Sequence, residues 1–218
     1  MSLFDPGRFE ADLAALGAAD SRLAAVLIQT GPPPMRRWPE GFETLVDVII
    51  GQQVSTHAAK AIKARLRTVI GTPTPAALAN ATEAELVAGG LSRAKQRYLR
   101  GLAQLVLDGA LVLEALPSLS DDDAITMLIQ APGIGRWTAE IYLLFALGRA
   151  DVWPADDLAL QAAAAHVHGM SERPKGKAAR AIADGWSPWR GAAAHLMWHL
   201  YHHQTGRAGT SAVSGDSA

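Results

Sequence analysis

The amino-acid sequence predicts an all-α fold. Alanine and leucine are abundant, and apolar residues recur at spacings of three and four, as on the buried face of an amphipathic helix. No segment between turn signals alternates apolar and polar residues as a half-buried strand does. The pattern therefore requires helices and no sheet.

Hydrophobic and charged residues make up 49% and 19% of the chain, which is typical of a globular protein. The absence of cysteine excludes disulfides, thiolate metal sites and a thiol nucleophile. No apolar run approaches the roughly 20 residues of a membrane span, and the N-terminus lacks a signal sequence. We therefore expect a soluble cytoplasmic protein, associated with the nucleoid if it is bacterial, that does not contact a membrane.

Turn-forming stretches separate the expected helices. Apolar spacing marks a helix around residues 9–16 and another around 45–49, on either side of the stretch TGPPPMRRWPEG. Ser120 followed by three aspartates predicts a helix start, because the hydroxyl caps an orphan amide and the carboxylates favour the positive end of the helix dipole. We prefer this interpretation of the acidic run to a metal site. Breaks are expected at 30–41, 71–75, 89–95, 116–123, 132–135, 148–157 and 171–176.

Charge is unevenly distributed, although the net charge is only −1. The regional net charges are −3 for residues 1–50, +5 for 51–110, −6 for 111–160 and +3 for 161–218. The two positive regions could meet a polyanion, but basic helix faces in contact with solvent explain them equally well.

The stretch LIQAPGIGRWTAE, residues 128–140, interrupts two helical patterns with a proline and two glycines. A turn explains the proline and Gly133, since proline stops a helix and glycine adopts the left-handed conformation after it. Gly135 leaves backbone amides uncovered at the start of the next helix, where the helix dipole favours an anion. We expect Ile134 to plug the turn into the core, and a phosphate to be bound by Gly133, Ile134, Gly135 and Arg136.

This hairpin, followed by DVWPADDLAL at 151–160, resembles the helix-hairpin-helix (HhH-GPD) DNA glycosylases, and in particular their 3-methyladenine DNA glycosylase II type. The resemblance extends over about residues 40–203 and is specific because several motifs occur in order. The other motifs are LVDVIIGQQVSTHAAKAI (45–62), LSRAKQRYLRGLA (91–103) and WSPWRGAAAHLMWH (186–199).

The resemblance implies two helical lobes with a central cleft that holds the lesion, a helix-hairpin-helix motif and no extra N-terminal α/β domain. One lobe is expected to be a helical barrel over residues 40–147, and the other to combine 1–39 with 148–204. Residues 205–218 contain too few apolar side chains to order themselves, and we expect a disordered tail there.

By its position in the family motif, Asp157 is the expected catalytic residue. A buried carboxylate can stabilise the positive charge that develops on the sugar, and it can orient or deprotonate the attacking water. The sequence leaves open which of these roles dominates. An aspartate before a helix is also a common N-cap, and we expect Asp156 to be that cap or to support Asp157.

Trp137 stands where strand-cutting relatives have a Schiff-base lysine, so the resemblance implies base removal without lyase activity. The face of an aromatic side chain attracts a purine that alkylation has made cationic, through stacking and cation–π contact. Ile141 replaces a tyrosine of well-known relatives, which indicates a more open pocket, and Trp153 is equally compatible with core packing. The expected base pocket is formed by Trp137, Trp198, Ile141 and Trp153. Core packing is the role expected of Trp38, Trp186 and Trp189.

Gln53 aligns with the wedge that, in this family, fills the hole left by a flipped base. The alternative is that Gln52 and Gln53 are a polar helix edge. The candidate contacts to the DNA backbone are Lys60, Lys63, Arg93, Lys95, Arg97 and Arg136.

We expect no cofactor and no catalytic metal. His195 and His199 share a helix face, but their spacing to His202 and His203 does not build a three-ligand site, and the role of this cluster is left open. The resemblance allows a monovalent cation at hairpin carbonyls near Ile134.

The sequence thus predicts a monomeric, monofunctional DNA glycosylase. It would flip alkylated purines of the 3-methyladenine and 7-methylguanine class out of double-stranded DNA and hydrolyse their N-glycosidic bond in base excision repair. Two alternatives stay open, a non-catalytic helix-hairpin-helix DNA-binding protein and a glycosylase for deaminated or oxidised bases.

Overall fold

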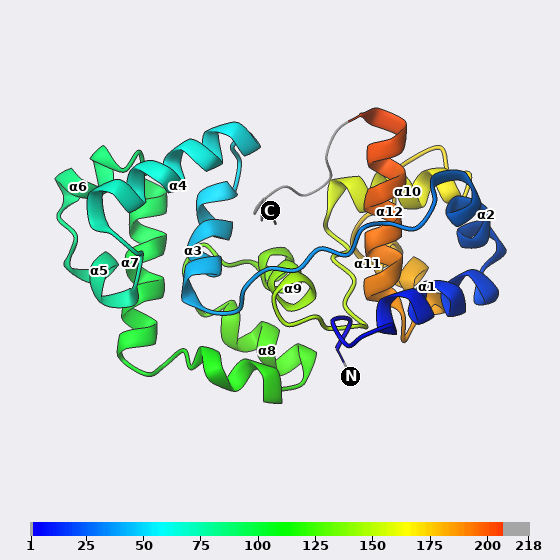
Figure 1. The fold of residues 1–218 in the computed structure, drawn as a ribbon, viewed down its shortest axis with the longest axis horizontal. Coiled ribbons are helices and arrows are strands. Elements are labelled where there is room, and N and C mark those ends of the chain that lie inside the picture. The colour runs from blue at the N-terminus through cyan, green and yellow to red at the C-terminus, as the bar shows by residue number, and fades with distance from the viewer. Residues whose placement is uncertain (1, 207–218) are drawn as a thin grey trace. The chain divides into compact units, whose positions relative to one another are not determined.

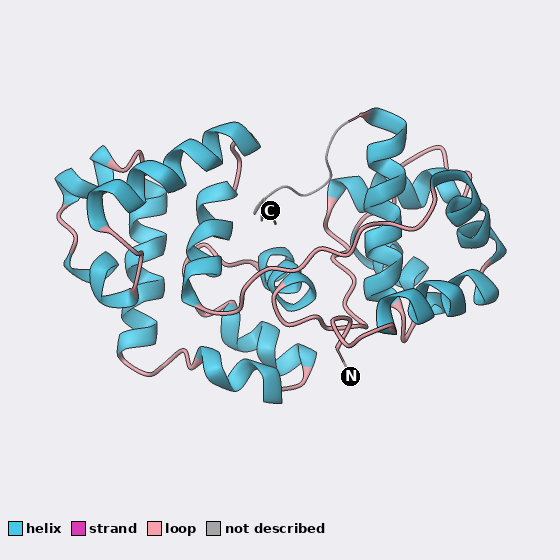
Figure 2. Ribbon diagram, in the orientation of Figure 1, coloured by secondary structure: helices cyan, strands magenta, loops and turns pink. Residues whose placement is uncertain are grey.

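A computed structural model describes residues 2–206, which form helices and loops without any β-strand (Figure 2). An isolated antiparallel bridge joins Ser2 and Arg149. The prediction of an all-α fold is confirmed. Within the described range, no helix is long and apolar enough to cross a membrane.

The chain divides into two compact units. The terminal unit comprises the described residues 2–37 and 143–206, and the central unit comprises 38–142. The second boundary falls inside a continuous helix, α9 (Arg136–Phe145), whereas the sequence places it at 147. The predicted tail lies outside the described residues from 207 onward, and the last helix still includes Thr205.

The terminal unit is built around α12 (Arg190–Thr205), which packs against three other helices of the unit (Figure 1). Residues 191–198 are all buried, as in a helix that is covered on every side. Gly191 allows the start of α12 to lie close to the backbone at Ala150, because a Cβ at this position would stand 2.8 Å from the Ala150 carbonyl oxygen. The other elements are α1 (Arg8–Ala19), α2 (Ser21–Thr30), α10 (Leu158–Val167), α11 (Gly176–Ile182) and the 3-10 turn η2 (Ala183–Trp186).

The central unit packs α7 (Arg93–Leu107) against α3 (Phe42–Gly51) and α5 (Pro75–Asn80), and packs α4 (Thr56–Ile70) against α3 and α6 (Glu83–Ala88). The chain then continues through the 3-10 turn η1 (Leu113–Ser118), α8 (Asp121–Leu128) and α9.

Side-chain caps start several helices of the central unit. The Ser120 hydroxyl accepts a hydrogen bond from the Asp123 amide, so the helix start predicted at Ser120 is confirmed. A turn not among the predicted breaks precedes α6, where Thr82 and Glu85 form a reciprocal capping box.

Candidate active site and nucleic-acid interface

Asp157 is the N-cap of α10 in the terminal unit. Its Oδ1 accepts hydrogen bonds from the Ala159 amide at 2.9 Å and the Leu160 amide at 3.0 Å. The prediction that Asp156 is the cap is therefore wrong, because α10 begins at Leu158 and the residue directly before it is the one that reaches these amides. Asp156 lies at the surface and forms an ion pair with Arg180 at 3.0 Å.

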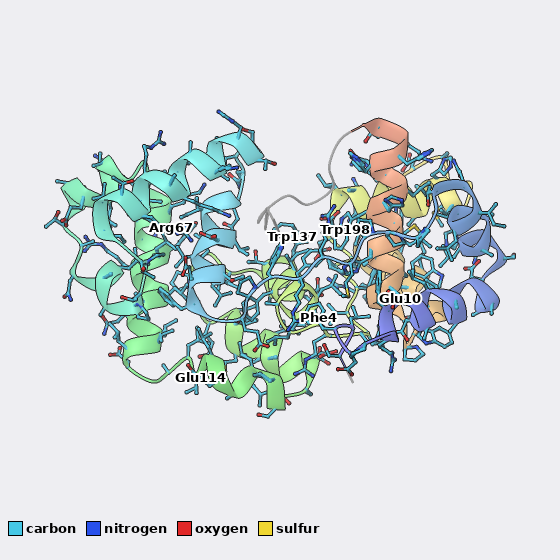
Figure 3. The ribbon with its side chains drawn as sticks, in the orientation of Figure 1. Phe4, Glu10, Arg67, Glu114, Trp137 and Trp198 are labelled. Carbon is cyan, nitrogen blue, oxygen red and sulfur yellow. The ribbon has the colours of Figure 1, made fainter. Side chains whose placement is uncertain are left out.

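Trp198, on α12, also bonds to Asp157. Its indole Nε1–H donates to Oδ1 at 3.1 Å, so three N–H donors converge on one carboxylate oxygen. The Asp157 and Trp198 residues are 6% and 1% exposed, and Trp198 packs on Phe145 with ring centroids 5.2 Å apart. The expectation that Trp198 lines an open pocket is corrected, since its ring is covered and its polar edge orients the carboxylate. Trp198 is labelled in Figure 3.

Arg36 belongs to the surroundings of Asp157, although the sequence did not indicate it. Burial lowers the pKa of the Arg36 guanidinium, and the negative charge of Asp157 opposes this by raising it. Arg36 follows a proline-rich loop without any motif, so only the folded chain reveals this proximity. The carboxylate thus has a cationic neighbour in addition to its hydrogen-bond donors.

Trp153 has a packing role. Its ring is buried, its Nε1–H donates to the Ala179 carbonyl at 3.1 Å, and it meets Trp186 edge to face at 5.2 Å. Of the two interpretations that the sequence allows for Trp153, the structure supports core packing, and its placement in the base pocket is corrected.

Trp137 and Ile141 lie on α9 in the central unit, one turn apart. Trp137 is partly exposed and is labelled in Figure 3. Ile141 has no exposed area, so it presents no surface to an open pocket and its assignment there is corrected. The neighbouring Tyr142 does not replace the missing tyrosine, because it is buried and its hydroxyl accepts a hydrogen bond from the Gly41 amide at 2.8 Å.

The hairpin between α8 and α9 has the predicted construction. Ile134 is buried, as expected for a plug into the core. Gly133 has φ of 84°, and a Cβ there would stand 2.5 Å from the Tyr98 ring, so both backbone and packing require glycine. Gly135 is exposed, with no atom within 4 Å of where a Cβ would stand, which leaves room for a ligand to approach the backbone.

Arg136, the first residue of α9, is paired inside the protein. Its Nε–H donates to buried Glu140 at 2.8 Å, and its Nη2 lies 3.6 Å from Asp122. Two carboxylates therefore pair with the positive charge that the sequence assigns to phosphate binding, while 48% of the Arg136 side chain stays exposed. The Gly133 carbonyl, one candidate ligand of a hairpin cation, already accepts a hydrogen bond from Gln52.

Residues 52–55, here called the wedge turn, connect α3 to α4. Gln53 is exposed and adopts φ of 56°, and it is the only non-glycine residue with positive φ in the described part of the chain. Gln52 is partly buried and donates to the Gly133 carbonyl of the hairpin and to the Thr138 hydroxyl of α9. The two glutamines are therefore not a polar helix edge, since α3 ends at Gly51. A pocket of about 400 Å³ lies between this turn, the start of α7 and Gly133.

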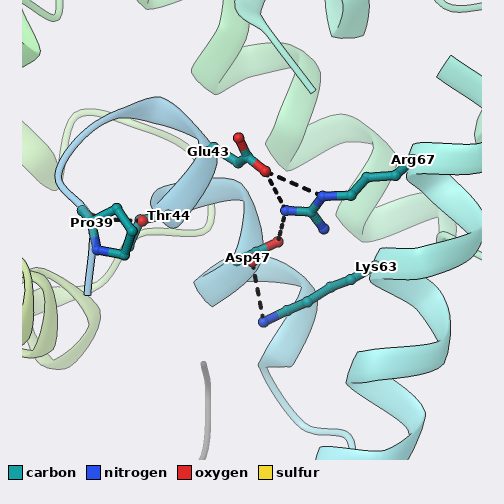
Figure 4. A network of polar contacts seen from close by, with 6 residues as sticks. All are labelled: Pro39, Glu43, Thr44, Asp47, Lys63 and Arg67. Atoms are coloured by element: carbon teal, nitrogen blue, oxygen red, sulfur yellow. Dashed lines mark hydrogen bonds and ion pairs between the residues drawn. The ribbon is translucent and has the colours of Figure 1, made fainter. Parts of the chain in front are cut away.

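The candidate contacts to the DNA backbone divide into side chains that are partly buried and bonded within the protein, and side chains that are exposed. Lys63 lies 3.5 Å from Asp47, within an ion-pair network in which Arg67 bonds to both Asp47 and Glu43 (Figure 4). Burial lowers the pKa of Lys63, and its side chain is only 13% exposed, so its assignment to DNA binding is corrected. Lys95 is partly buried and donates to the Ile50 carbonyl at 2.6 Å. Exposed positions are held by Lys60, Arg93 and Arg97.

Two of the histidines of α12 bond to backbone carbonyls. His195 is buried among aromatic rings and bonds through Nδ1 to the Gly191 carbonyl at 2.8 Å, and His199 bonds through Nε2 to the Thr30 carbonyl at 3.0 Å. His202 and His203 are exposed. Among residues 2–206, no group of three or more histidine or carboxylate side chains is arranged to hold a metal ion.

Comparisons of the chain with protein families, known proteins and solved structures bear on this site. A family model described as HhH-GPD superfamily base excision DNA repair protein matches residues 46–188. DNA-3-methyladenine glycosylase 1 of Schizosaccharomyces pombe is 32% identical over 163 residues, which are 73% of this chain and 72% of that protein. The structure of a 3-methyladenine DNA glycosylase from the same yeast, in complex with abasic DNA, matches with a TM-score of 0.77 at 29% identity and covers 88% of this chain and 95% of the other. A DNA-3-methyladenine glycosidase from Bacillus halodurans gives a TM-score of 0.79 at 28% identity, with 95% and 94% covered.

Proposed function

Because the chain belongs to the HhH-GPD superfamily of base excision DNA repair proteins, we propose that it is a monofunctional DNA glycosylase. It hydrolyses the N-glycosidic bond of alkylated purines in double-stranded DNA, with 3-methyladenine and 7-methylguanine as its first substrates. The relatives at about 30% identity carry names of this activity, which supports the alkylated substrate class.

The observation that carries the proposal is the position of Asp157. Its carboxylate is nearly buried at a helix N-terminus, and three N–H donors hold one of its oxygens. A fixed negative charge stabilises the oxocarbenium-like sugar that forms as the bond to the base breaks. The same carboxylate can orient the attacking water and take its proton. An alkylated purine already carries positive charge and leaves readily, so the enzyme needs no strong general acid.

The proposal of a monofunctional enzyme rests on Trp137. This position follows the hairpin glycines and would carry an amine in an enzyme that forms a Schiff base with the sugar. An indole cannot form that bond, so the expected product is an intact abasic site. Partly exposed, the ring face can stack on a flipped cationic purine.

The central unit supplies the proposed contacts to DNA. The hairpin leaves open space at Gly135 beside a helix N-terminus, which favours a phosphate. Gln53 is exposed on the wedge turn and would fill the hole that a flipped base leaves in the duplex. Backbone contacts without base specificity suit an enzyme that must examine any sequence.

The test is the release of free methylpurine from methylated duplex DNA, measured by chromatography for the wild type, Asp157→Asn and Asp156→Asn. Asparagine keeps an oxygen for the helix cap, so Asp157→Asn should fold, yet its rate should fall by roughly 10³-fold because the fixed charge is lost. Asp156→Asn changes a surface ion pair and should stay within about twofold. A wild type that binds DNA without releasing any base would establish a non-catalytic binder instead.

A second assay addresses strand cleavage. Borohydride traps a Schiff base as a covalent protein–DNA adduct, so the wild type should give no adduct during base release. Hypoxanthine and 8-oxoguanine duplexes included in the same panel test for a deaminated-base or oxidised-base enzyme. A faster release of either base than of 3-methyladenine would replace the proposed substrate class.

A further inference from the structure

The wedge turn and the hairpin are joined by one side chain. The Gln52 Nε2 donates hydrogen bonds to the Gly133 carbonyl at 2.9 Å and to the Thr138 hydroxyl at 3.2 Å. Gln52 is the C-cap of α3, Gly133 lies in the hairpin, and Thr138 is in the first turn of α9. An amide NH₂ has two hydrogens, and both are used in this contact. The side chain thus connects the end of α3 to the hairpin and the start of α9, 81 and 86 positions later in the sequence.

Several contacts hold the ends of the wedge turn. Before the turn, Gln52 makes its contacts with Gly133 and Thr138, and Lys95 of α7 donates to the Ile50 carbonyl. After it, Ser55 caps α4. A pocket of about 400 Å³ borders the middle of the turn, and its lining includes Gln53, Val54, Lys95 and Tyr98. The turn is therefore fixed chiefly at its ends.

The backbone of Gln53 needs such fixed ends. Its φ of 56° is a conformation that residues with a side chain rarely adopt. A disfavoured conformation persists where the surrounding structure determines it, and such positions concentrate where binding requires a particular side-chain direction. Without the bonds of Gln52, the turn could relax and Gln53 would lose its exposed position on the strained backbone.

We propose that Gln52 is a positioning residue that couples the wedge turn to the phosphate-binding hairpin, so that both elements engage DNA as one unit. This rests on the proposed function, because it takes Gln53 as the residue that enters the duplex. Binding of a phosphate at the hairpin then fixes where Gln53 meets the base stack, through a direct hydrogen bond to the Gly133 carbonyl.

The test measures binding and needs no catalysis. Fluorescence anisotropy gives the Kd for a duplex with a central tetrahydrofuran abasic analogue and for the intact duplex, and their ratio is the preference for a hole in the stack. Gln52→Leu keeps the size of the side chain and removes the hydrogen bonds, and it should lower this preference about tenfold. The matched control is Gln104→Leu on α7, where the wild-type amide bonds to exposed Asp108, and it should keep the wild-type ratio.

A double-mutant cycle separates coupling from general damage. If Gln52 acts through Gln53, then Gln52→Leu should have little further effect on the preference in a Gln53→Ala background. Full additivity of the two changes, or a wild-type preference in Gln52→Leu, would overturn the coupling. Failure of the proposed function looks different, since the wild type itself would then release no methylpurine.

Gln52→Glu covers the case in which the leucine variant does not fold. An ionised carboxylate is an acceptor only and repels the Gly133 carbonyl, whereas the protonated acid can donate to it. The preference of Gln52→Glu should therefore be low at pH 7.5 and should recover about fivefold toward about pH 5, where more glutamate is protonated. The wild-type ratio over the same range is the reference, and parallel curves would contradict the proposal.

Discussion

The two units present their functional side chains in opposite ways. In the terminal unit, Asp157 is nearly covered and three donors hold one of its oxygens. In the central unit, Gln53 is exposed on a strained backbone and Gly135 leaves open space around the hairpin. Electrostatic stabilisation of a reacting sugar needs a fixed charge away from water, whereas contact with a duplex needs exposed groups. Changes in the terminal unit should therefore alter stability and rate, and changes in the central unit should alter binding.

The largest expected effect concerns the acid sensitivity of the terminal unit. Burial lowers the pKa of His195 from 6.5 to about 4, although its bond to the Gly191 carbonyl opposes this. The unfolded chain therefore binds more protons than the folded one between these values. The stability contributed by neutral His195 is complete above pH 6.5 and is lost as the pH falls to about 4, by an amount of about 3 kcal/mol.

Urea unfolding between pH 7 and about pH 4.5 measures this loss. His195→Leu should show a flatter pH dependence than the wild type, whereas His203→Leu, at an exposed position, should keep the wild-type slope. Asp20 contributes to stability over a different pH range. Its pKa is lowered chiefly by the hydrogen bond to Arg22, so its contribution is present above 3.8 and is lost only below that value. Equal slopes for His195→Leu and the wild type would show that the buried ring is not the acid-sensitive group.

The second effect tests whether a change in the terminal unit lowers the catalytic rate and leaves substrate binding nearly unchanged. Trp198→Phe removes the indole N–H from Asp157 and keeps an aromatic ring, and a hydrogen bond to a charged group is worth about 2 kcal/mol. We expect kcat for methylpurine release to fall roughly 30-fold with little change in KM. Trp153→Phe is the matched control, because it also loses a buried indole bond, to the Ala179 carbonyl, without touching Asp157. If both variants lower stability and kcat equally, Trp198 has no special role in orienting the carboxylate.

The sequence was sufficient for features that depend on neighbouring residues. The helix start at Ser120 and the burial of Ile134 follow from local capping and turn chemistry. The start at Thr82 was equally readable, since Thr82 and Glu85 have capping-box spacing. The N-cap role of Asp157 was also a local matter, because the cap directly precedes the first helical residue.

Features that depend on contacts between distant segments could not be predicted. The bond from Trp198 to Asp157 spans 41 positions, and the bond from Gln52 to Gly133 spans 81. A residue type shows that an indole or amide can donate, but not where its donor points. Arg36 carries no motif, and its closeness to Asp157 arises only in the folded unit.

The third effect concerns a change in the hairpin of the central unit that should weaken its contact with DNA. Gly133→Ala should weaken binding to the abasic-analogue duplex about tenfold, because φ of 84° and the Tyr98 ring both exclude a Cβ. Release from fully bound substrate should fall less than twofold, since Asp157 is untouched. Gly109→Ala is the control, with a similar φ of 69° but open space around its Cβ and no place in the hairpin. A normal Kd for Gly133→Ala would show that the hairpin backbone does not determine binding.

The smallest effect separates two basic side chains within the central unit. Arg93 is exposed at the start of α7, whereas Lys63 is 13% exposed and paired with Asp47. Each phosphate contact that is lost lowers the slope of log Kd against log salt by about one. Arg93→Met should therefore weaken binding about threefold and reduce that slope, whereas Lys63→Met should keep the slope and lower the unfolding free energy by about 1 kcal/mol. The reverse result would mean that the Asp47 pair opens when DNA binds, and that burial in the free protein does not decide which lysines and arginines meet the phosphates.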